Sequence, residues 1–139
     1  MRASGNDTTY FRINDAVSLV YDPVGDFTQT FSDRVHPTKG SIVVKGGCFQ
    51  MSGAYTFAAV PTIDIAAGAR FSIGVTSVSA LAGLRALKLG DGSRFEVSAG
   101  TPNPFPTTGL RVMMTSDSRF AIPAGFVLTG GGVFVDGVP

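Results

Sequence analysis

The chain has 139 residues, of which 44% are hydrophobic and only 15% charged, enough for one hydrophobic core and too short for two ordinary domains. Its 18 glycines and 8 prolines favour turns and short elements, whereas Glu occurs once and Lys three times, which excludes a helical bundle, a coiled coil and an acidic disordered tail. Eleven basic and ten acidic residues leave a net charge of +1, so no strong field draws the protein to nucleic acid or to a membrane.

Residues 1–16 are polar and precede every copy of the repeat described below. Their hydrophobic residues, Tyr10, Phe11 and Ile13, are too sparse to form a core of their own. We therefore predict a contact arm over residues 1–16, which adds a strand to a partner's sheet or places these side chains in grooves, and a single all-β domain over residues 17–139. The segment has no apolar stretch typical of a secretory signal, and no window of the chain is apolar enough to span a membrane. We expect synthesis and assembly in a cytoplasm.

A repeat occupies most of the chain. Segments 62–73, 86–97 and 111–122 align closely, and each carries an Arg-Phe pair in the same place. The pairs stand at 70/71, 94/95 and 119/120, in steps of 24 and 25 residues. Segment 41–49 is a weaker copy, with Cys48 and Phe49 at the position of the pair. The weakest copy places Leu19, Tyr21, Gly25 and Phe27 at the equivalent positions.

Each unit is predicted to be a strand, a tight turn and a second strand. Hydrophobic residues alternate in both strands, as in Ile63 and Ile65 of the first and Phe71 and Ile73 of the second, which indicates half-buried strands. The turn carries a residue tolerant of positive φ at one fixed place, namely Gly68, Gly92 or Asp117. The stretch 78–89 has room for one helical turn.

A unit of about 24 residues must stack on its neighbours to bury its hydrophobic face. Two all-β arrangements fit: a short parallel β-helix, in which each unit is one coil, and a jelly-roll-like sandwich, in which each unit is an antiparallel hairpin. In either, Phe71, Phe95 and Phe120 are predicted to be buried in one column or layer. The tail 125–139 is predicted to be the last strand pair, with a turn at 130–132, or else a second arm.

The sequence offers little material for catalysis. Cys48 is expected to be a small buried residue, and His36 to lie in a surface loop. One His and one Cys do not make a zinc site, and Asp64 and Glu96 face outward from different units and are not the facing carboxylates that a glycosidase needs. We therefore predict no enzyme activity, no catalytic, metal or cofactor-binding residues, and no cofactor.

The outward feature that repeats is an arginine before each inward phenylalanine: Arg70, Arg94 and Arg119. If the units stack in parallel, these residues form a ladder on one face. They are either solvated arginines whose stems cover hydrophobic surface or a docking stripe for carboxylates on a protein partner. Nucleic acid is a poor fit, since the chain has neither the net charge nor an aromatic platform for it.

In its size, its Arg-Phe repeat over Thr62 to Ile122 and its glycine-rich hydrophobic tail, the chain resembles the cement (decoration) proteins on the heads of tailed phages, particularly short-tailed phages. The resemblance implies a structural virion protein on the outer surface of the capsid, forming a homodimer or homotrimer, that binds the major capsid protein and braces the shell. For such a role, the partner-binding residues that we predict from the N-terminal segment and from the repeat are Tyr10, Phe11, Ile13, Arg70, Arg94 and Arg119. Alternatives are a β-helical module of a phage tail fibre or spike that binds host glycan and, more distantly, a small carbohydrate-active enzyme.

Overall fold

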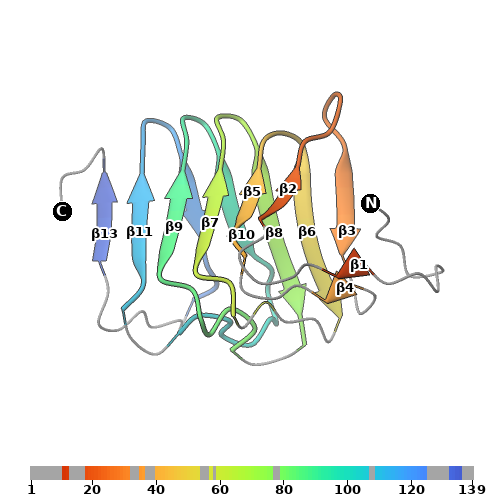
Figure 1. Cartoon of the computed structure of the whole chain (residues 1–139). Helices are drawn as coiled ribbons and strands as arrows, with labels where there is room; N and C mark the ends of the chain where they lie inside the picture. The colour runs from red at the N-terminus through yellow and green to blue at the C-terminus, as the bar shows by residue number, and fades with distance from the viewer. Residues whose placement is uncertain are drawn as a thin grey trace.

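The computed structural model describes residues 11–12, 18–31, 35–36, 40–53, 57, 59–76, 79–106, 109–124 and 132–135. Over these residues the chain is all-β and winds into a parallel β-solenoid, in which each coil contributes one strand to each of two facing sheets (Figure 1).

Within the described residues, three sheets are formed. The five-stranded sheet has the spatial order β12 (Arg119–Ala121), β10 (Arg94–Val97), β8 (Arg70–Val75), β6 (Cys48–Gly53) and β3 (Thr28–Phe31). The six-stranded sheet has the order β13 (Gly132–Val135), β11 (Arg111–Met114), β9 (Ala86–Leu89), β7 (Thr62–Ile65), β5 (Ile42–Val44) and β2 (Leu19–Tyr21). The small sheet consists of β1 (Phe11–Arg12) and β4 (Val35–His36).

All pairings between the described strands are parallel. This confirms the β-helix and shows that the jelly-roll-like sandwich is wrong, because hairpin units would pair antiparallel. The connections between units, such as residues 98–110, carry the chain back to the first sheet, so each unit starts again one strand further along.

The strand register confirms the alignment of the three clear copies. Arg94 pairs with Arg70 on one side and with Arg119 on the other, and the phenylalanines that follow are in register in the same way. Four residues connect the two strands of each of these units. The predicted turn position has a positive φ in all three: +73° at Gly68, +65° at Gly92 and +60° at Asp117.

The first coil departs from the predicted alignment. Leu19 pairs with Ile42 and is buried as expected, but Gln29, not Phe27, pairs with Phe49. Six residues separate β2 from β3, whereas three separate β5 from β6 and four connect the strands of each later unit, and the longer first turn moves Phe27 out of the column. The Phe27 side chain is 63% exposed, so the prediction that it belongs to the phenylalanine series is wrong.

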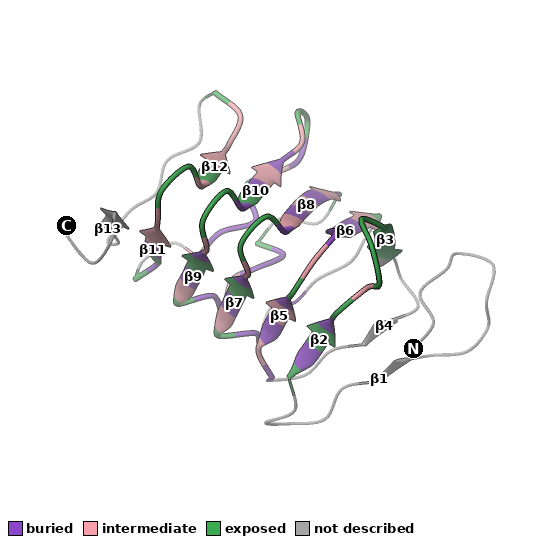
Figure 2. Cartoon of the chain, turned by 90° about the horizontal axis from the view of Figure 1, so that it is seen from above, coloured by how far each residue is buried: buried purple, intermediate pink, exposed green. Residues whose placement is uncertain are grey.

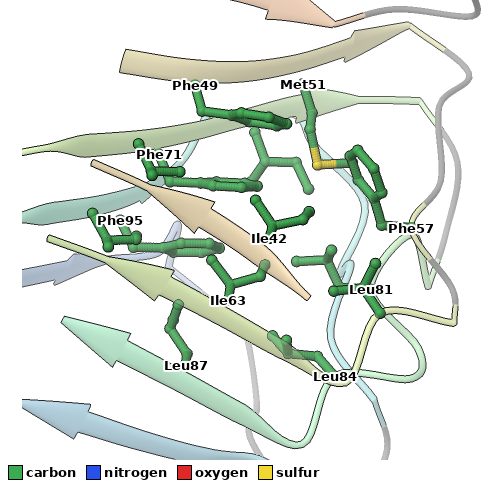
Figure 3. Close-up of a cluster of buried hydrophobic side chains, with 14 of the residues drawn as sticks. Ile42, Phe49, Met51, Phe57, Ile63, Phe71, Leu81, Leu84, Leu87 and Phe95 are labelled. Atoms are coloured by element: carbon green, nitrogen blue, oxygen red, sulfur yellow. The ribbon is translucent and has the colours of Figure 1, made fainter. Parts of the chain in front are cut away.

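The core is a column of aromatic rings on the five-stranded sheet that faces aliphatic side chains of the other sheet (Figure 3). The rings of Phe49, Phe71, Phe95 and Phe120 are stacked, with successive centroids 5.0, 5.2 and 5.6 Å apart. The first three rings are fully buried and Phe120 partly so. The predicted column is therefore confirmed, and the identical register of each coil places the rings close enough to stack.

The connection between β8 and β9 forms successive turns, in the stretch with room for one helical turn. The N–H groups of Ala82 and Leu84 donate to the carbonyl oxygens of Ser79 and Leu81, and no helix forms within the described residues 79–89. Leu81 and Leu84 are fully buried, so this connection closes one side of the core.

Several predictions concern the two ends of the chain. Phe11 lies in β1, which pairs with Val35–His36 of β4, whereas Tyr10 and Ile13 lie outside the described residues. The arm over residues 1–16 therefore stays a prediction. The backbone of His36 is in a strand and not in the expected loop.

At the other end, β13 adds to β11 in parallel. Gly132 is the first residue of this strand, so the turn predicted over 130–132 is wrong at that residue. Residues 125–131 and 136–139 lie outside the described residues.

Candidate functional site

The outer face of the five-stranded sheet carries the arginines that the repeat singled out. Their neighbours in sequence, the phenylalanines, point into the core, so strand alternation turns Arg70, Arg94 and Arg119 outward. We call these three residues the arginine row. Parallel strands are about 4.8 Å apart, which places three cationic side chains side by side, with Cys48 in register next to Arg70.

Carboxylates neutralise two members of the row. Arg70 forms an ion pair with Asp26, and Arg94 forms one with Glu96 at 2.6 Å. All four side chains remain substantially exposed, so each pair adds little stability, but together they reduce the repulsion between neighbouring guanidinium groups. Arg119 is exposed, and no described residue supplies an acceptor for its guanidinium.

Sequence reasoning missed both acceptors. Glu96 is two residues after Arg94 in the same strand, hence on the same face, and this spacing was a usable signal. Asp26 is 44 residues before Arg70, in the turn between β2 and β3, and no local pattern indicates that contact. The longer first turn, which displaces Phe27, carries Asp26 to the arginine row.

Two shallow grooves follow the row across the sheet. One has a volume of about 250 Å³ and is lined by Cys48, Arg70, Phe71, Ser72, Arg94 and Glu96. The second, of about 280 Å³, continues from Arg94 and Glu96 toward Ala121 and Ile122. Both grooves are lined by the ion pair of Arg94 and Glu96, and we call the two grooves together the polar channel.

Cys48 lies at the start of this channel as a free, buried thiol, which confirms the prediction of a small buried residue. Burial raises the pKa of the Cys48 thiol, and the nearby Arg70 guanidinium opposes this rise only in part. The protonated thiol is a weak nucleophile. Burial also raises the pKa of Tyr21, whose hydroxyl donates to the carbonyl oxygen of Phe27 at 2.9 Å.

The other candidate groups are dispersed. Asp64 is exposed on β7 and Glu96 is on β10, in different sheets, so these two carboxylates do not face each other. Among the described residues, no three His, Cys, Asp or Glu side chains lie close enough together to hold a metal ion. The side chain of His36 lies outside the described residues. The described part of the chain contains no helix long and hydrophobic enough to cross a membrane.

The fold defines the chain as a short parallel β-solenoid whose outer face carries a charged row and a polar channel. Comparisons with models of protein families, with curated proteins and with solved structures found no match.

Proposed function

We propose that this protein is a structural component of a phage particle, which binds the major capsid protein on the outside of the head and braces neighbouring subunits. The observation that carries the proposal is the in-register arginine row, which ends at Arg119 without an acceptor among the described residues. A cation held on a rigid strand at a fixed spacing suits recognition of a carboxylate on another protein.

The solenoid supports this role mechanically. The row crosses three coils, all fixed by continuous strand ladders and by the stacked core. A partner can therefore contact several coils at once, and a protein that touches more than one shell subunit gains avidity without any single strong contact.

The ion pairs within the row also suit a docking face. The guanidinium groups of Arg70 and Arg94 are held near Asp26 and Glu96, so a partner meets side chains that are already ordered. Ordering fewer side chains on binding lowers the entropic cost of association. In this proposal the channel has no catalytic role.

The proposal is tested by co-sedimentation of the protein with assembled shells of the major capsid protein. Arg119→Glu should weaken binding at least about tenfold, because it puts a like charge opposite the partner's carboxylate. Higher salt should weaken binding of the unaltered protein, because the contact is electrostatic.

Lys88→Glu is the matched control, since Lys88 is an exposed basic residue on β9, on the outer face of the other sheet. It makes the same change in net charge and should alter binding by no more than about twofold. Equal loss in the two variants would indicate a general charge effect, and undiminished binding of Arg119→Glu would exclude the arginine row as the docking face.

The predicted arm is tested separately by deleting residues 1–13. If the arm only contacts the partner, deletion should leave the melting temperature nearly unchanged and weaken binding to the shells. A truncated protein that fails to fold would make the segment part of the domain, and one that binds as tightly as the full chain would leave the arginine row as the contact.

The polar channel favours a second candidate function, namely binding of a host glycan by a tail-fibre or spike module. The hydroxyl of Ser72, the carboxylate of Glu96 and the guanidinium groups of Arg70 and Arg94 line a groove on the outer face of the sheet, where the hydroxyl groups of a sugar chain would meet both hydrogen-bond donors and an acceptor. Calorimetric titration with host surface polysaccharide distinguishes the two functions: binding to glycan without binding to shells would favour the second.

A further inference from the structure

At the end formed by β12 and β13, the two sheets of the described solenoid differ in length by one strand. In the described residues, the five-stranded sheet stops at β12, whereas the six-stranded sheet continues beyond β11 to β13. The outer edge of β11 is thus covered by a strand, and no described residue pairs with the outer edge of β12. Figure 1 shows β13 as the strand beyond β11, and Figure 2 shows β12 and β11 in the two facing rows of strands.

The core is less completely covered at this end than in the coil before it. Phe95 and Val97 of the preceding coil are buried, but their counterparts Phe120 and Ile122 are only partly buried. The aromatic column therefore ends in a ring that keeps some exposure to solvent, next to an open strand edge. An open edge of this kind is a template for pairing with another strand.

The backbone N–H and C=O groups of β12 are oriented so that a further strand could pair with them. In a parallel pair, the N–H and C=O of one residue both point to the same neighbouring strand, and those of the next residue point away. The N–H of Arg119 donates to the carbonyl oxygen of Ser93, next to β10. The N–H and C=O of Phe120 consequently point to the open edge.

We infer that a second copy of this chain covers this edge, in a two-fold dimer in which β12 of each copy pairs with β13 of the other. The two-fold axis lies between the sheets and parallel to the strands, so it exchanges the five-stranded and six-stranded sheets. The strands of the two sheets run in opposite directions (Figure 1), so both new pairs are antiparallel. The resemblance to cement proteins implies a homodimer or homotrimer; the strand edges are a separate argument for a dimer, and this argument does not depend on binding to a capsid.

This dimer is favoured because, in the described residues, the six-stranded sheet extends one strand further than the five-stranded sheet. The two-fold axis places the six-stranded sheet of one copy in line with the five-stranded sheet of the other. The β12 edges of both copies are therefore covered at the same time. Head-to-tail stacking does not fit in this way, because the first coil offers β2 and β3 as the two edges of a single coil. If β3 of the next copy paired with β12, its β2 would meet the position that β13 already fills. The two-fold arrangement is also closed, whereas head-to-tail contacts would continue into fibres.

The first test is the oligomeric state of the full chain, measured by sedimentation velocity from nanomolar concentrations to the solubility limit. We expect a monomer–dimer equilibrium. Phe120→Glu should weaken dimerisation at least about tenfold, because it places a carboxylate where the dimer excludes water. Ala121→Glu is the control: it lies in the same strand with its side chain on the outer face, and it should dimerise within about twofold of the unaltered protein. A monomer at every concentration, or equal loss of dimer in the two variants, would overturn the inference.

Hydrogen exchange at the Phe120 amide of the unaltered protein provides a second test that requires no variant. In the dimer this amide is bonded to the second copy, so its exchange should slow with rising protein concentration, while the Arg119 amide, bonded within the chain, should not change. Exchange at Phe120 that is independent of concentration would show that a second copy does not cover the edge, and would exclude the dimer even if Phe120→Glu failed to fold.

Discussion

Truncation of Phe95 is the most demanding test of the stacked core. The ring is fully buried and has aromatic neighbours on several sides: Phe71 at 5.2 Å, Phe120 at 5.6 Å and Phe105 at 5.9 Å between centroids. Phe95→Ala removes the buried area of the ring and leaves a cavity that strands fixed by their ladders cannot close. The expected loss in the free energy of unfolding is about 4 kcal/mol, within the usual 3–5 kcal/mol for such a truncation. The melting temperature should fall by roughly 10–20 °C.

Urea unfolding followed by circular dichroism measures this loss, with Phe27→Ala as the matched control. Phe27 lies in the first turn with its side chain 63% exposed, so its truncation should change the free energy of unfolding by no more than about 0.5 kcal/mol. The stacked column would be refuted if Phe95→Ala cost less than about 1.5 kcal/mol or no more than the control.

Three further predictions concern the turns and the buried thiol. Gly92→Ala should destabilise the protein by about 1 kcal/mol through backbone conformation alone, because φ is +65° and no atom lies within 4 Å of the added Cβ. Gly90→Ala should cost more, since its added Cβ would lie 2.7 Å from the backbone nitrogen of Ala67. Thermal unfolding of the two variants shows which of them is the less stable. Because burial raises the pKa of Cys48, the thiol should react with a disulfide reagent much more slowly in the folded than in the unfolded protein at pH 7, and equal rates would contradict the described burial. The same raised pKa means that the Cys48 thiol contributes to the free energy of unfolding in full below its unfolded-state pKa, and that this contribution is lost as pH rises through its folded-state pKa. Unfolding measured from pH 7 to 10 should therefore show a decline in stability.

The repeated part of the fold was predictable because each unit obeys the same local rules. Alternating residues such as Ile63 and Ile65 indicate strands, and the fixed place of Gly68 in its unit indicates the turn, so the register followed from the alignment. The choice between β-helix and sandwich was not predictable, because alternation and turn chemistry are the same for a coil and for a hairpin. It depends on where the connections return the chain, which is a tertiary property.

The candidate site was predictable only where it belongs to the repeat. The arginine row follows from the period, but the pairing of Asp26 with Arg70 depends on a first turn of six residues, where the later units have three or four. The same irregularity displaced Phe27 from the column. The edge of β12 that no described residue pairs with depends on the tertiary arrangement of the coils, and a local sequence pattern does not determine it.

Binding of the solenoid to a capsid through its arginine row can be seen directly by cryo-electron microscopy of shells incubated with the full chain. If the solenoid binds in this way, the shells should carry added density on their outer surface that fits the solenoid, with the five-stranded sheet and Arg119 facing the major capsid protein. Shells without added density, or density with the six-stranded sheet against the shell, would contradict this mode of binding.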